Sequence, residues 1–68
     1  MASGTVKWFN PVRGFGFIQP DDGSRDVFVV GAALELAGLD GLVEGQRVQF
    51  DLERQRNGRR AAANLRAD

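Results

Sequence analysis

The stretch that decides the fold is Arg13-Gly14-Phe15-Gly16-Phe17-Ile18, followed after a turn by Val27-Phe28-Val29-Val30. Both stretches have the composition of β-strands but lack the apolar–polar alternation of a strand with one solvated face. A strand in a small sheet buries one face and turns the other outward. A chain of 68 residues has little material for a second layer over that outer face. The two stretches therefore predict an open sheet face that carries aromatic side chains, which suits stacking on nucleic-acid bases.

Five segments have the composition and the turn boundaries of short strands. They span residues 5–10, 14–19, 25–30, 46–53 and 60–65, and Asn57-Gly58 marks a tight hairpin between the last two. Segment 31–45 is interrupted by glycines, so we expect a long loop with one helical turn. Five strands with one long connection after the third predict an all-β fold: a five-stranded antiparallel OB-type Greek-key barrel, with the SH3-like barrel as the competing geometry. We expect residues 1–68 to form one domain.

The two-residue period of a strand assigns its side chains to faces. Phe15 and Phe17 share one face, and we place them outside together with Phe28. The opposite assignment would overfill a small barrel with rings and would expose Ile18 and Val27 instead. Trp8 is expected at the surface, although it could also cover one end of the core. The predicted core consists of Val6, Ile18, Val27, Val29, Val48, Phe50 and Leu52.

The formal net charge is zero, but the charges are unevenly distributed. Lys7 and Arg13 make the start basic, the middle of the chain is acidic, and arginines such as Arg59 and Arg60 make the end basic. These arginines either form a solvated hairpin or contact phosphate groups. Any nucleic-acid binding should therefore depend mainly on stacking and show a shallow salt dependence.

Several classes of protein do not fit the composition. There is no cysteine, which is compatible with a reducing cytoplasm, and we expect neither a secretory signal nor a membrane span. The chain also has no histidine and a single lysine, so we expect no enzyme and no small-molecule substrate. Asp21, Asp22 and Asp26 are the candidates for a metal cluster, but Pro20-Asp21-Asp22-Gly23 fits a turn better. Gly14-x-Gly16 lacks the third glycine of a dinucleotide site. We expect no metal and no cofactor.

Five segments, in order and spacing, resemble the bacterial cold-shock protein family. They are residues 4–10, 13–18, 21–24, 26–29 and 44–48. Residues 13–18 resemble the motif RNP1, and the segment from Val27 resembles RNP2. In the RRM domain, which also carries RNP1, the two motifs occur in the reverse order. The resemblance implies a five-stranded OB-type barrel in the cytoplasm that binds single-stranded RNA and DNA, as an RNA chaperone, a transcription antiterminator or a stress regulator.

The resemblance also implies a set of contact residues. They are Lys7, Trp8, Asn10, Arg13, Phe15, Phe17, Asp22 and Phe28, with Phe9 as a weaker candidate. The acid Asp22 fits its turn better than a base contact. Apart from the resemblance, we add Val30 for an apolar contact and Arg59 and Arg60 for phosphate contacts, which would offset part of any loss in affinity.

Three positions depart from the family pattern. Val30 and Gly31 stand where the family usually has histidine and phenylalanine, and Leu39 takes the place of a frequent loop aromatic. Stacking is worth roughly 1–3 kcal/mol per base, so the loss of two platforms predicts binding weaker by about 2–6 kcal/mol and a shorter footprint. A small barrel that binds proteins through this apolar face is the alternative function.

Overall fold

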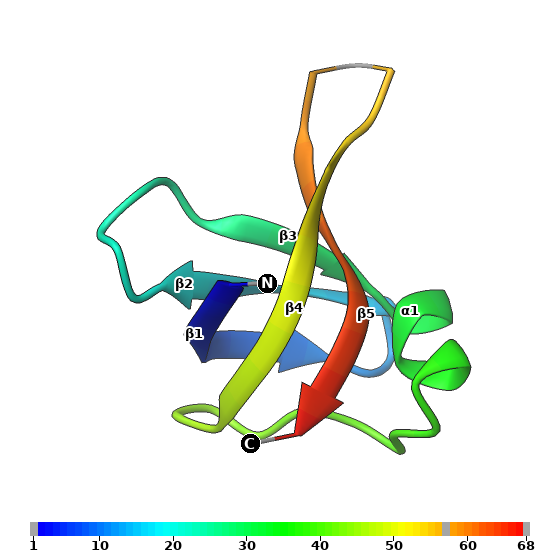
Figure 1. Ribbon diagram of the computed structural model, residues 1–68. Helices are drawn as coiled ribbons and strands as arrows, with labels where there is room; N and C mark the ends of the chain where they lie inside the picture. Colours follow the sequence, from blue (N-terminus) through cyan, green and yellow to red (C-terminus); the bar gives the residue numbers. More distant parts are fainter. Residues whose placement is uncertain (1, 57, 68) are drawn as a thin grey trace.

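Five strands close into a barrel in the computed structural model, which describes residues 2–56 and 58–67 (Figure 1). The strand order around the barrel is β1-β2-β3-β5-β4, and β4 pairs with β1 to close it. The elements are β1 (Ala2–Asn10), β2 (Phe15–Pro20), β3 (Val27–Val30), α1 (Gly31–Leu36), β4 (Arg47–Arg54) and β5 (Arg60–Ala67). The predicted all-β, OB-type barrel is confirmed.

The strand pairs are antiparallel except at one seam. β3 and β5 run parallel and pair through Phe28 and Ala61. β1 begins three residues earlier than expected because its first residues pair with β4, with Ala2 opposite Phe50. Such a long-range pairing leaves no local signal in the sequence. The single short helix α1 agrees with the helical turn expected after the third strand.

The hairpin between β4 and β5 extends beyond the other strands (Figure 1). It is closed by the backbone N–H of Gln55, which donates to the carbonyl oxygen of Arg59 at 2.9 Å. Gly58 has a φ of 81°, a conformation that favours glycine. Asn57, the other residue of the predicted turn, lies outside the described residues.

The core follows the predicted alternation in the central strands. Six of the seven predicted core residues are at most 1% exposed and belong to the buried cluster: Val6, Ile18, Val27, Val29, Val48 and Phe50. The prediction for Leu52 is wrong, because its side chain is 44% exposed. Leu52 continues the alternation of Val48 and Phe50, but it belongs to the last three residues of β4, all of which are exposed.

The helical part of the described chain is small. α1 has six residues, and no helix within residues 2–56 and 58–67 has the length and apolar character needed to cross a bilayer.

Candidate nucleic-acid interface

Four aromatic rings form a cluster on the outer face of β1, β2 and β3. Phe17 lies opposite Trp8 on β1 and opposite Phe28 on β3, while Phe15 lies two residues before Phe17 on the same face. Ring centroids are 5.5 Å apart for Trp8 and Phe15, 5.3 Å for Trp8 and Phe17, and 5.6 Å from Phe28 to each of the other phenylalanines. The rings meet edge-on or tilted, which is a favourable arrangement for aromatic pairs. We call Trp8, Phe15, Phe17 and Phe28 the aromatic face.

The outward orientation of the three phenylalanines on this face agrees with the alternation in the sequence. Their rings are half-buried, whereas the residues next to them along the strands, Ile18, Val27 and Val29, are fully buried. The barrel wall therefore has aliphatic side chains inside and aromatic side chains outside.

A β-bulge places the indole of Trp8 on the same face. Strict alternation would turn Trp8 inward with Val6 and Phe9 outward. The register of β1 against β2 shifts between Val6 and Trp8, and this extra residue reverses the alternation. Trp8 is consequently 41% exposed, while Phe9 is half-buried and packs against the core. The structure thus separates Phe9, a weaker candidate for base contact, from the aromatic face.

Gly16 allows the bulged strand to approach β2. A Cβ added to Gly16 would lie 2.7 Å from the Cα of Phe9 and closer still to the carbonyl oxygen of Trp8. Real side chains do not tolerate such contacts with backbone atoms, so only glycine fits here. Gly16 therefore contributes to the aromatic face by letting the backbone beneath Trp8 come close.

Cationic side chains border the aromatic face. The Lys7 Nζ lies 3.0 Å from the carboxylate of Asp26, and the Arg59 guanidinium lies 4.9 Å from the centroid of the Phe28 ring. Arg60 donates from Nη2 to the Ser24 hydroxyl at 3.2 Å. Arg59 and Arg60 line one hollow together with Phe17 and Phe28, and the charge of Lys7 is shared with Asp26.

Two of the polar candidates shape turns. The Asn10 Oδ1 accepts hydrogen bonds from the backbone N–H groups of Val12 (3.0 Å) and Arg13 (3.1 Å), which orders the turn before β2. The Asp22 Oδ1 accepts from the backbone N–H of Ser24 (2.9 Å) and from its hydroxyl (2.6 Å). The hydrogen bond from the Ser24 hydroxyl, followed by that from its backbone, lowers the pKa of Asp22 below 3.8. This geometry favours the turn role for Asp22. Arg13 is exposed in the turn that Asn10 orders.

Val30 lies at the edge of the aromatic face. It pairs with Phe15 across β2 and β3, is half-buried, and immediately precedes α1. It supplies an apolar contact surface without a ring. The side chain of Leu39 is partly buried and packs against the core cluster.

Two residues near the aromatic face were absent from the predicted set. Arg25 and Asp26 line a hollow of about 270 Å³ together with Phe17, Phe28 and Arg59. A signal for Asp26 was available, because it is two residues before Phe28 and therefore on the same side by alternation. Its ion pair with Lys7 depends on the barrel. Within the described ranges, no group of three or more His, Cys, Asp or Glu residues is arranged to hold a metal ion.

Comparison with known proteins gives the family. The family model described as the 'Cold-shock' DNA-binding domain matches residues 2–67. The chain is 60% identical over 68 residues to the cold shock protein CspA of Rhizobium meliloti (strain 1021), covering 98% of this chain and 99% of that protein. It is 52% identical over 59 residues to the cold shock-like protein CspE of Escherichia coli (strain K12), covering 87% and 86% of the two chains. It is also 45% identical over 64 residues to glycine-rich protein 2 of Nicotiana sylvestris, covering 94% of this chain and 30% of that protein. The chain therefore belongs to the cold-shock domain family, whose members are non-enzymatic proteins that bind single-stranded nucleic acid.

Proposed function

We propose that this protein binds single-stranded RNA and DNA on its aromatic face and acts as an RNA chaperone or transcription antiterminator in the bacterial cytoplasm. The observation that carries the proposal is the aromatic face itself: four adjoining rings on one open side of a barrel whose core is complete without them. Rings presented in this way provide platforms on which bases of any sequence can stack.

The proposed mechanism is passive. Bases that become unpaired in an RNA hairpin stack on Trp8, Phe15, Phe17 and Phe28, and the bound strand is withdrawn from the folding equilibrium of the hairpin by mass action. Lys7, Arg13, Arg59 and Arg60 would contact phosphate groups or base edges beside the rings. No nucleotide hydrolysis is involved. Because stacking rather than these few charges would supply most of the affinity, we expect binding to weaken only modestly with salt.

We propose further that binding is weaker than in relatives with rings at more positions. Val30 lacks a ring, Leu39 packs against the core, and Gly31 has no side chain. The loss of two stacking platforms corresponds to about 2–6 kcal/mol, or roughly thirtyfold to ten-thousandfold in Kd. The footprint on a single strand should be correspondingly shorter.

Quenching of the single tryptophan, Trp8, during titration with oligo-dT tests both proposals. Parallel titrations with oligo-dA and with a duplex show whether unpaired bases are required. Binding to single strands but not to the duplex would support the function. The absence of a response to any single strand would refute it, and nanomolar binding to a dT hexamer would refute the weaker affinity.

Restoring a ring at Gly31 tests the reason for the weaker affinity. A Cβ at Gly31 would lie 3.4 Å from the nearest atom, the carbonyl oxygen of Gly14, so a side chain fits with little adjustment. Gly31→Phe should tighten oligo-dT binding by about 1–3 kcal/mol, whereas Gly31→Ala, the matched control, should leave it nearly unchanged. Equal affinities of the two variants would contradict this reason.

An RNA hairpin labelled with a fluorophore and a quencher tests the chaperone role. The protein should open the hairpin without ATP, and Phe17→Ala should open it less at the same concentration. A variant that binds oligo-dT normally but opens the hairpin poorly would contradict a purely passive mechanism.

A further inference from the structure

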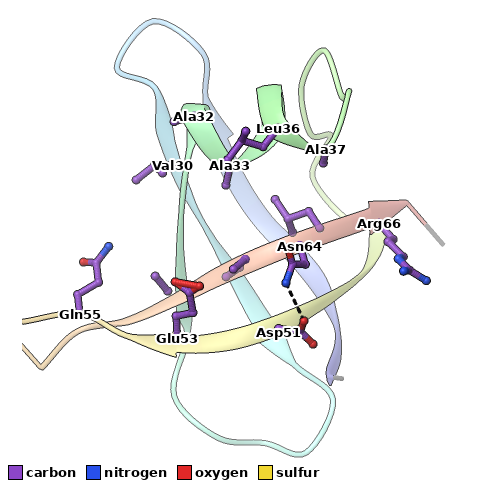
Figure 2. A pocket seen from close by; sticks show the side chains of 14 residues that line it. Val30, Ala32, Ala33, Leu36, Ala37, Asp51, Glu53, Gln55, Asn64 and Arg66 are labelled. Carbon is purple, nitrogen blue, oxygen red and sulfur yellow. Dashed lines mark hydrogen bonds between the residues drawn. The ribbon is translucent and has the colours of Figure 1, made fainter.

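A second surface adjoins the aromatic face and differs from it in chemistry. A groove of about 580 Å³ lies between α1 and the outer side of β5 and β4 (Figure 2). Ala61, Ala62 and Ala63 of β5 line it, with Leu36 of α1 and Glu53 of β4 among the residues around them. We call this surface the α1 groove.

The α1 groove is aliphatic, and one large side chain is left in solvent beside it. Leu36 is 91% exposed, although it belongs to the only turn of helix that covers this side of the barrel within the described residues. The side chains of β5 that line the groove with Leu36 include three alanines, which are short. An aliphatic side chain from a partner could fill the groove and bury Leu36, and the removal of apolar surface from water would stabilise the complex.

Carboxylates line the β4 side of the groove. Phe28 pairs with Ala61, which in turn pairs with Glu53, and Ala63 pairs with Asp51. The outer face of the barrel therefore changes from aromatic on β3 to small and aliphatic on β5 and then to acidic on β4. Figure 2 shows Glu53 and Asp51 on β4, with Asp51 accepting a hydrogen bond from the Asn64 Nδ2 at 2.9 Å.

This chemistry does not suit a nucleic-acid strand. None of the described residues that line the α1 groove is aromatic, so bases would have no ring to stack on. Phosphate groups that entered it would approach Glu53 and Asp51 and be repelled. Among these described lining residues Arg66 is the one cation, against two carboxylates.

We propose that the α1 groove docks a peptide segment of a protein partner that carries aliphatic side chains and a lysine or arginine. The aliphatic side chains would pack between Leu36 and the alanines of β5, and the cation would pair with Glu53. A partner bound there would sit beside Val30, where the groove meets the aromatic face. The protein could thus hold a single strand and a protein partner on adjacent surfaces. The inference does not depend on the proposed nucleic-acid function.

Two synthetic peptides with the same leucine pattern, one carrying lysines and the other glutamates, test the proposal. Titrated into the ¹⁵N-labelled protein, the leucine–lysine peptide should shift amide resonances of α1 and β5 and bind more tightly than the leucine–glutamate peptide. Glu53→Lys should weaken the leucine–lysine peptide about fivefold and strengthen the other. Glu44→Lys, which changes the net charge equally on an exposed residue outside the groove, is the control and should do neither.

The exposed leucine gives an independent test. Leu36→Ser should weaken both peptides, by up to about tenfold, without unfolding the barrel, because the residue is almost fully exposed in the free protein. Equal binding of the two peptides, or shifts confined to the aromatic face, would overturn the proposal. It would also be overturned if Glu53→Lys tightened oligo-dT more than Glu44→Lys does, since the groove would then belong to the path of the nucleic acid.

Discussion

Replacing Phe28 and Phe50 with alanine, one at a time, should separate the outside of the barrel wall from its inside. The Phe28 ring is half-buried and lies 5.6 Å from each of two phenylalanine rings and 4.9 Å from the guanidinium carbon of Arg59. Its removal should weaken oligonucleotide binding by about 1–3 kcal/mol, or roughly fivefold to 150-fold in Kd. Its few edge contacts suggest a smaller loss in the free energy of unfolding, about 1–2 kcal/mol.

Phe50 makes the opposite contribution. It is 0% exposed and is the largest fully buried side chain in the core. A core Phe→Ala substitution lowers the free energy of unfolding by about 3–5 kcal/mol, which equals the roughly 3–5 kcal/mol that a barrel of this size is expected to have in total. Phe50→Ala should therefore have a free energy of unfolding near zero, with a large fraction of the protein unfolded at room temperature.

Urea unfolding followed by circular dichroism and oligo-dT titration followed by Trp8 fluorescence measure the two effects separately. The fluorescence remains usable in Phe28→Ala because the ring neighbours of Trp8 are Phe15 and Phe17. Phe28→Ala should be folded and bind weakly. The reasoning about the faces fails if Phe28→Ala unfolds as Phe50→Ala does, or if it binds with the affinity of the unmodified protein.

Three further substitutions test individual contacts. Gly16→Ala should lower the free energy of unfolding by about 1–3 kcal/mol, because the new Cβ would press on the backbone of Phe9; urea unfolding measures this, and an unchanged midpoint would contradict the close approach. The hydrogen bond from Arg47 lowers the pKa of the Asp21 carboxyl in the folded state. The stability that the ionised carboxylate contributes is therefore present above the ordinary pKa of 3.8 and is lost as the pH falls through the lower, folded-state pKa. The stability of Asp21→Asn should therefore fall less steeply below pH 3.8 than that of the unmodified protein. Identical acid-unfolding curves for the two proteins would argue against a stabilising Asp21–Arg47 ion pair. Leu52→Ser should change the free energy of unfolding by only about 0.5–1 kcal/mol, since the side chain is already 44% exposed; urea unfolding checks this, and a loss as large as that of a core residue would contradict its exposure.

Much of the barrel wall could be predicted because its strands obey a period of two. In β2 and β3, alternation alone separated Ile18, Val27 and Val29 from the phenylalanines between them, and the structure confirms this separation. The prediction succeeded because a one-residue slip would have exposed the aliphatic side chains together. The size of the interior decided which of the two sets faces inward, since a barrel of five short strands has room for aliphatic side chains but not for every ring.

Alternation was insufficient wherever the barrel departs from regular geometry. Leu52 has the spacing of a core residue, but it lies in the last three residues of β4, where the strand is exposed on both faces. Phe9 and Trp8 exchange faces at a bulge whose position depends on how β1 meets β2. The sequence carries one trace of this bulge, Gly16, because a glycine inside a strand often marks a close approach of another backbone. It does not say which residue of the neighbouring strand comes close.

Contacts around the candidate site were even less predictable. Lys7 and Asp26 are far apart in sequence and meet because β1 and β3 both pair with β2. Phe28 and Arg59 are also far apart, and they meet because Arg59 lies in the connection between β4 and β5, next to β3. The α1 groove likewise arises only where helix, β5 and β4 come together.

The amino-acid sequence by itself determined which side chains face the solvent along β2 and β3, because side chains alternate along a strand and so small an interior admits the aliphatic set rather than every ring. Tertiary structure decided where the bulge turns Trp8 outward, where the interior ends before Leu52, and which charges accompany the rings. These features depend on closure of the barrel, which joins strands whose pairing no local pattern encodes.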